Sequence, residues 1–390
     1  MRARVFWSVF ILALLASGCV TEFKANLPSG DQQILIVDGS IMGDSTVIFQ
    51  LSKSYSVDST LAPPDVFNID ATITIIGNNG YESTPATPLG NGAYSINTGT
   101  LDDNVEYGIK IIYNGDTYQS ALSKPLLTPE IDSLSWVQPE INGPVGICVS
   151  THDNNTNEPE FFLWDYVEDW EINASYPTSA FFNPEDSTFY SDFSEPFYHC
   201  WKHNVSSNYI VGSTESLKEN QIINKQFYQA ELLDRFTVLY CITVNQKTIS
   251  KSAYDYYQNR IQLNEEMGGL FTPQPSNLDG NISCTTNPSK RAIGYVGVTK
   301  NTTHKRLFVY PQQISHPYND CGVISQEDVN AYLTQIGITY ADYYKLGYRP
   351  AFSLNSLTFF PDYWALSPCT NCTYNGGSKV KPDFWPNDDQ

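Results

Sequence analysis

Basic residues are scarce in this chain. Lysine and arginine together number 22, against 42 aspartate and glutamate residues, and the formal net charge is -20. Nucleic acids and anionic lipid headgroups are bound by basic patches, so this balance argues against charge-driven binding to either. The sequence therefore predicts no nucleic-acid partner. It is compatible with a solvated bacterial exterior, cationic partners or bound metal ions.

Common catalytic motifs are also absent. The chain has five histidines. It has no Gly-x-Ser-x-Gly motif, which is typical of many serine hydrolases, and no His-Glu-x-x-His motif, which is typical of many zinc proteases. His199 and His203 are four residues apart and could hold a metal if they shared a helix face. Their aromatic neighbours favour a strand instead. We therefore expect no catalytic residues and no cofactor, apart from calcium at one loop.

Long apolar runs are missing after the amino terminus. Residues 5–15 are apolar but too few to span a bilayer, and they follow Arg2 and Arg4. Small residues at 16–18 then precede Cys19. This order is typical of a bacterial lipoprotein signal, which predicts removal of residues 1–18, lipid on Cys19 and a lipidated tether over 19–30. The alternative is an ordinary cleaved signal with a chance cysteine.

The remaining sequence favours strands and polar loops. Alternating apolar runs meet Asn-Gly pairs at 79–80, 91–92 and 114–115, and Asn-Gly is a strong hairpin signal because both central residues of a type I′ turn need positive φ. We predict a mainly β protein. An immunoglobulin-like β-sandwich covers 31–128, and a larger β-rich domain with a few short helices covers 129–390. The helices are expected to start near Ser252, Ser325 and Ala341.

Eight cysteines are present, and seven remain once Cys19 carries lipid. Export favours disulfides over metal thiolates, although connectivity cannot be deduced from sequence. We expect Cys148 and Cys241 to be buried free thiols, because they lie in apolar runs. The expected pairs are Cys200 with Cys284, and Cys321 with Cys369 or Cys372.

One polar loop could bind calcium. It offers oxygen ligands at alternating positions, as calcium prefers, but it lacks the glycine and the closing glutamate of an EF-hand loop. A polar hairpin turn is the alternative. The candidate ligands are Asp153, Asn155, Asn157 and Glu158.

A cluster of carboxylates lies next to Trp164 and Trp170. Paired carboxylates beside tryptophan suit glycoside hydrolysis or sugar stacking, whereas packed aromatic residues in an acidic strand pair are the alternative. On one continuous strand, Glu168 would face away from the other three carboxylates. Those three are Asp165, Asp169 and Glu171.

Phe271 lies among two glycines and two prolines, at 268–275. These residues fix an unusual backbone path, which could present Phe271 to a partner or plug the core of the second domain. Together with Trp164 and Trp170, it is a candidate for a partner or ligand surface.

Several longer sequence segments resemble those of a known family. They are WDYVEDWEI at 164–172, YHCWK at 198–202, GGLFTPQPSNLDGNI at 268–282 with Cys284 following, IGYVGV at 293–298 and KPDFW at 381–385. With the lipoprotein start, the chain is similar to the Bacteroidota lipoproteins of domain-of-unknown-function family 4249. This resemblance implies an envelope lipoprotein, often encoded near a TonB-dependent outer-membrane transporter. It implies no catalytic residues.

The expected function is therefore that of a non-enzymatic lipoprotein of the outer membrane, anchored by lipid at the cell surface. It would bind a ligand or partner as an accessory to a TonB-dependent β-barrel transporter. One alternative is a surface glycan hydrolase that uses the carboxylates near Trp164 and Trp170. Another is a structural or adhesion module, in which the first sandwich spaces the second domain from the membrane.

Overall fold

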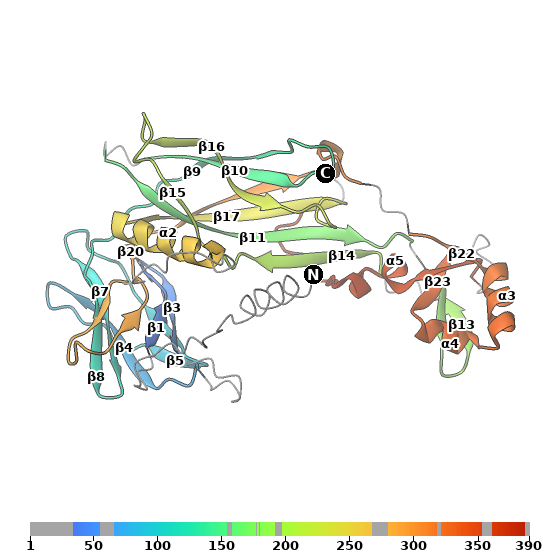
Figure 1. Cartoon of the computed structure of the whole chain (residues 1–390), viewed down its shortest axis with the longest axis horizontal. Coiled ribbons are helices and arrows are strands. Elements are labelled where there is room, and N and C mark those ends of the chain that lie inside the picture. The colour runs from blue at the N-terminus through green and yellow to red at the C-terminus, as the bar shows by residue number, and fades with distance from the viewer. Residues whose placement is uncertain are drawn as a thin grey trace, which may run out of the picture.

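The computed structural model describes the chain in three parts, arranged along the long axis of the molecule (Figure 1). An amino-terminal β-sandwich lies at one end, two sheets of longer strands lie in the middle, and a small lobe of short strands and helices lies at the other end. The described residues are 34–54, 66–153, 158–176, 178, 180–191, 197–266, 280–317, 321–352 and 361–386. The chain is mainly β, as predicted.

The sandwich begins with eight strands in sequence order. They are β1 (Leu35–Asp38), β2 (Ile41–Met42), β3 (Thr46–Lys53), β4 (Ala71–Gly77), β5 (Thr87–Gly90), β6 (Ala93–Asn97), β7 (Tyr107–Tyr113) and β8 (Asp116–Ser120). Asn114 and Gly115 connect β7 to β8, and both have positive φ, at 51° and 79°. The hairpin predicted there is therefore present. Alternate residues of both sheets, among them Phe49, Ile73 and Ile109, are fully buried between the sheets.

Three late strands complete this sandwich. β18 (Ile282–Cys284) pairs with β8, β19 (Ala292–Ile293) runs parallel to β1, and β20 (Val298–Thr299) runs parallel to β2. The two sheets have the orders β19-β1-β3-β6-β5 and β18-β8-β7-β4. The sandwich thus takes residues from far beyond the 31–128 range expected from the sequence.

The middle of the molecule is a second pair of sheets. One contains β9 (Ile131–Val137), β10 (Val145–His152) and β16 (Gln221–Ala230). The other contains β14 (His199–Val205), β11 (Phe161–Asn173), β17 (Leu239–Ile249) and β21 (Thr303–Val309), with β15 (Ile210–Ser213) also on β11. Their apolar faces share one core. Helix α2 (Lys251–Glu266) packs its Ala253 and Tyr257 against Phe161 and Leu163 of β11.

The distal lobe holds most of the short elements. Its strands are β12 (Ala180–Asn183), β13 (Thr188–Ser191), β22 (Ile324–Ser325), β23 (Tyr348–Phe352) and β24 (Tyr363–Leu366). Its helices are α3 (Gln326–Ile336) and α4 (Tyr340–Lys345), and α5 (Ser367–Thr370) and the 3-10 turn η2 (Cys372–Asn375) connect it to the central sheets. A further 3-10 turn, η1 (Pro311–Gln313), follows β21. As predicted, Ser325 caps α3, which ends at Gly337 with φ 74°.

The disulfides correct one sequence prediction. Cys200 bonds to Cys372 and not to Cys284. The predicted Cys200–Cys284 pair is wrong because β18 carries Cys284 into the first sandwich, where its thiol is free and buried. Cys321 bonds to Cys369, one of the two expected partners. Both bonds hold the α5–η2 segment, so they connect the distal lobe to β14.

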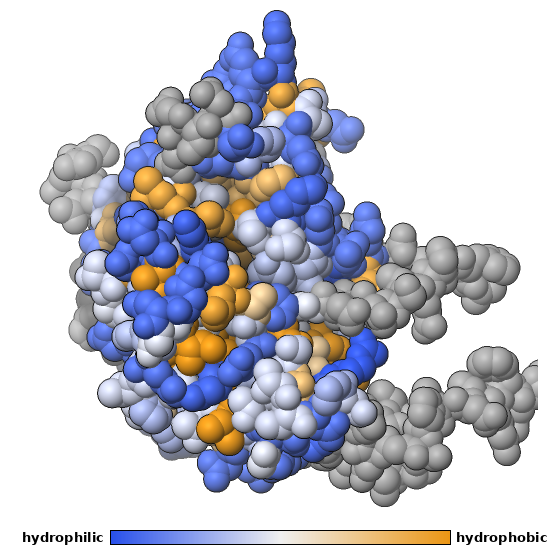
Figure 2. Space-filling view, turned by 90° about the vertical axis from the view of Figure 1, so that its left-hand side faces the viewer, coloured by the Kyte–Doolittle hydropathy of each residue, from blue (hydrophilic) through white to orange (hydrophobic). Residues whose placement is uncertain are grey.

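Viewed from the sandwich end, the surface shows apolar residues set among hydrophilic ones (Figure 2). A small pocket of about 130 Å³ lies between the sandwich and the central sheets, where Leu126 and Val298 meet Leu163, Ile249 and Tyr257. Among the described residues, no helix has the length and apolar character that a membrane crossing requires.

Candidate functional site

A pocket lined by aromatic rings lies where the distal lobe meets the central sheets. Its volume is about 270 Å³. Residues from five elements line it: β12, β13, α4, β23 and the α5–η2 segment. The rings that line it are Phe181, Phe182, Tyr190, Phe197, Tyr344 and Tyr374.

The rings support one another. Phe181 stacks on Tyr190 with centroids 5.5 Å apart, and it meets Phe197 edge-on at 6.0 Å. Phe182 is 3% exposed and packs on Tyr344 at 5.8 Å. Such contacts fix ring orientation before any ligand arrives. The pocket is therefore preformed, and flat apolar groups fit its walls.

Among the described residues that line the pocket, Arg349 is the charged one. Its Nη1 donates to the backbone oxygens of Tyr344 and Tyr348, at 2.6 and 2.8 Å. Its guanidinium lies over the Tyr344 ring, with Cζ 3.3 Å from the centroid, and Tyr374 lies at 5.5 Å. Burial raises the pKa of the Tyr344 hydroxyl, while the nearby Arg349 charge lowers it in part. The cation is thus held in one orientation inside an aromatic wall.

The α5–η2 wall is fixed by covalent and polar contacts. Cys369 and Cys372 carry the two disulfides. Between them, the Asn371 side-chain oxygen accepts from the Thr373 amide and hydroxyl at 2.8 and 2.7 Å. Crosslinks and a capped turn limit local motion. Of the described residues that line the pocket, none is a histidine, cysteine or carboxylate, so the arrangement suits binding better than acid–base chemistry.

The carboxylates of β11 occupy both faces of one continuous strand. β11 pairs with β17 in unbroken register from Phe161 to Glu171, so Glu168 faces away from the other three, as expected. Glu168 is fully buried. It accepts hydrogen bonds from Arg235, Tyr228, Tyr240 and Asn204, at 2.8–3.4 Å. A carboxylate with this many internal partners is part of the core.

The three carboxylates on the opposite face also have partners. Asp165 accepts from the Asn245 amide at 2.6 Å. Asp169 and Glu171 are buried, and each lies within 2.9 Å of a histidine ring nitrogen, on His203 and His199 respectively. These contacts favour a structural role over the acid and nucleophile roles that two carboxylates play in glycoside hydrolysis.

The tryptophans of this strand are core residues. Trp164 is 0% and Trp170 6% exposed. The prediction that they form a binding surface is therefore wrong. The pattern of alternation places both on the inner face, where they fill the space between the central sheets.

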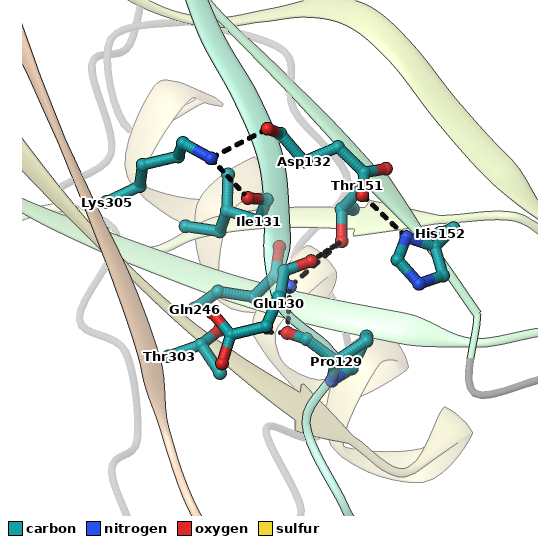
Figure 3. A network of polar contacts seen from close by, with 9 residues as sticks. All are labelled: Pro129, Glu130, Ile131, Asp132, Thr151, His152, Gln246, Thr303 and Lys305. Atoms are coloured by element: carbon teal, nitrogen blue, oxygen red, sulfur yellow. Dashed lines mark hydrogen bonds and ion pairs between the residues drawn. The ribbon is translucent and has the colours of Figure 1, made fainter.

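A buried polar network fixes the segment at Pro129, which follows the sandwich, to the central sheets (Figure 3). The side chain of Gln246 donates to the Pro129 carbonyl and to the Thr151 hydroxyl, both at 3.0 Å. Its oxygen accepts from the Trp164 indole at 2.8 Å. The Thr303 hydroxyl also donates to Pro129, at 2.9 Å. The link between the two parts is therefore an ordered junction.

Four predicted site residues lie outside the described part of the chain: Cys19, Asn155, Asn157 and Phe271. At the predicted calcium loop, the Asp153 amide and the Glu158 carbonyl instead bond to Asn220, at 3.0 and 3.2 Å. Within the described ranges there is no group of three or more histidine, cysteine or acidic residues placed to hold a metal. Calcium binding there stays a prediction.

Comparison with known families decides the relationship of this chain. The model of the family described as "Domain of unknown function (DUF4249)" matches residues 20–305. The chain belongs to this family. The resemblance read from the sequence phrases is thereby confirmed for DUF4249.

No curated protein matches this DUF4249 chain. Among solved structures, it is similar to a two fibronectin type-III domain segment from chicken tenascin. Sequence identity is 10%, 54% of this chain and 88% of the other are covered, and the TM-score is 0.16. A TM-score this low supports no argument, so the fold assignment depends on the sheets themselves.

Proposed function

We propose that this DUF4249 protein is a non-enzymatic lipoprotein of the outer membrane that binds a ligand or partner as an accessory to a TonB-dependent transporter. The observation that carries the proposal is the preformed aromatic pocket where the distal lobe meets the central sheets. The distal lobe itself lies at the end opposite the sandwich (Figure 1). Lining residues without histidine, cysteine or carboxylate favour recognition over catalysis.

The order of the parts supports this arrangement. The proposed lipid on Cys19 would attach the protein close to the sandwich, whose first strand starts at Leu35. The junction at Pro129 is held by buried hydrogen bonds, so the central sheets extend from the sandwich in a fixed direction. The pocket would then stand away from the membrane surface, where it can meet a ligand or the loops of a transporter.

The transporter partner is the part of the proposal that comes from the family resemblance. Its test is co-purification of a β-barrel transporter with the full-length protein from mildly solubilised outer membranes. Recovery of the protein only as a free monomer would contradict it. Protease treatment of intact cells would test the cell-surface location, and mass spectrometry of the amino-terminal peptide would test lipid on Cys19.

The spacer alternative needs a careful deletion. Removing residues 31–128 alone would leave β18, β19 and β20 without their partners. A clean test therefore replaces 31–128 and 281–300 together, with a short loop in place of the second segment. Unchanged partner binding by that variant would support a sandwich that only provides distance.

A further inference from the structure

Arg349 has an unused hydrogen-bond donor beside the distal pocket. The two hydrogen bonds of its guanidinium both leave from Nη1. The Nε atom is buried, so a ligand cannot reach it. Nη2 has no partner among the described residues and, unlike Nε, is not buried, so it is the donor that can meet a carboxylate oxygen.

The surroundings of Arg349 favour an anion. The protein carries a net charge of -20, yet no carboxylate occurs among the described residues that line this pocket. An arginine that has no ion-pair partner among the described residues, in an aromatic-lined pocket of an acidic protein, has the features of an anion site.

The pocket walls define the rest of the ligand. Phe181 with Tyr190 forms one stacked wall, and Tyr344 with Tyr374 lies beside the guanidinium. Aromatic faces of this kind pack against flat apolar rings. A volume of about 270 Å³ is just below the range usual for drug-sized ligands, so a compound with one ring fits the space.

We propose that the distal pocket binds a small carboxylate with a flat apolar ring. A carboxylate oxygen accepts from Nη2 of Arg349, and the ring packs between the aromatic walls. This inference depends on the binding function proposed above and specifies the ligand class.

The test compares phenylacetate with its neutral isostere phenylacetamide, by titration calorimetry on the full-length purified protein. We expect phenylacetate to bind at least ten-fold more tightly. Arg349→Gln should remove that difference while leaving phenylacetamide binding unchanged, which also shows that the pocket is intact. Arg306→Gln is the matched control, because Arg306 stacks on Phe384 at 3.7 Å outside the pocket, and it should change neither affinity.

Arg349→Lys keeps the charge but loses the planar group that the Nη1 bonds and the Tyr344 ring hold in place, so it should weaken phenylacetate at least several-fold. Equal binding of the two probes to the wild type would overturn the inference, as would a difference that survives Arg349→Gln. Phenylphosphonate binding ten-fold more tightly than phenylacetate would replace the carboxylate with a phosphate-type ligand. If no probe binds but a transporter still co-purifies, the ligand class is wrong and the proposed accessory function stands. If phenylacetate binds as expected and no transporter co-purifies, the ligand class stands and the proposed accessory function is wrong.

Discussion

Glu168 offers the sharpest test of how the central sheets are held together. Its side chain is fully buried and pairs with Arg235, whose Nε lies 3.0 Å away. Three neutral donors, on Tyr228, Tyr240 and Asn204, complete the set. Burial and the neighbouring Glu168 charge raise the pKa of Tyr240 well above its usual value, so that hydroxyl remains a donor throughout the ordinary pH range.

Replacing Glu168 with leucine would leave the Arg235 cation and several hydroxyl and amide donors without an acceptor. Breaking a buried ion pair from one side costs about 3–5 kcal/mol. Glu168→Gln keeps the volume and one acceptor oxygen, so the expected loss is smaller, about 1–3 kcal/mol. In the double variant Glu168→Leu/Arg235→Met, both charges are gone, and the loss should be well below the sum of the single losses.

Urea denaturation with the disulfides intact gives the free energies of unfolding. Tryptophan fluorescence is a suitable probe, because Arg235 lies 4.7 Å from the Trp170 ring centre. The matched control is Glu215→Gln, which removes an exposed partner of Lys251 and should cost less than about 1 kcal/mol. A loss below about 1 kcal/mol for Glu168→Leu, or additive losses in the double variant, would refute the reasoning from buried charge.

Two further predictions concern the core and the junction. Iodoacetamide at pH 8 should label none of Cys148, Cys241 and Cys284 in the folded protein and all three in denaturant, because all three are buried. Burial also raises the pKa of Cys148, and it raises that of Cys241 to about 12. Rapid labelling of the folded protein, detected by mass spectrometry, would contradict this. Gln246→Leu should lower the free energy of unfolding by about 1–3 kcal/mol, because it removes hydrogen-bond partners from the Trp164 indole and the Pro129 carbonyl. It should also speed proteolytic cleavage between the sandwich and the central sheets. An unchanged melting temperature and cleavage rate would show that the junction does not depend on Gln246.

Local signals in the sequence predicted local structure well. Asn114 and Gly115 form the expected hairpin, and Ser325 starts the expected helix. These features depend on the conformational preferences of a few neighbouring residues. The apolar residues from Ile293 to Thr299 favour one strand of the second domain, but the structure divides them into two short strands that pair with β1 and β2 of the sandwich. Strand propensity does not show which strand will be the partner.

The candidate site was beyond reach of the sequence for a related reason. Phe181, Tyr344, Arg349 and Tyr374 come from separate segments that only the fold brings together. Taken alone, each of these aromatic residues is typical of a hydrophobic core, and an arginine in a tyrosine-rich segment is a weak indication of a binding site. The same limit explains the wrong partner predicted for Cys200, because the partner depends on which segments pack side by side.

The late return of β18, β19 and β20 has a consequence for biogenesis. A polypeptide threaded across a membrane amino end first would deliver β1 and β8 long before their neighbours arrive. Until residues 282–299 emerge, both strands remain open edges, which invite pairing with other chains. A chain that is secreted in this direction would therefore carry an incomplete sandwich until these late residues arrive, and it would be prone to aggregate in that interval.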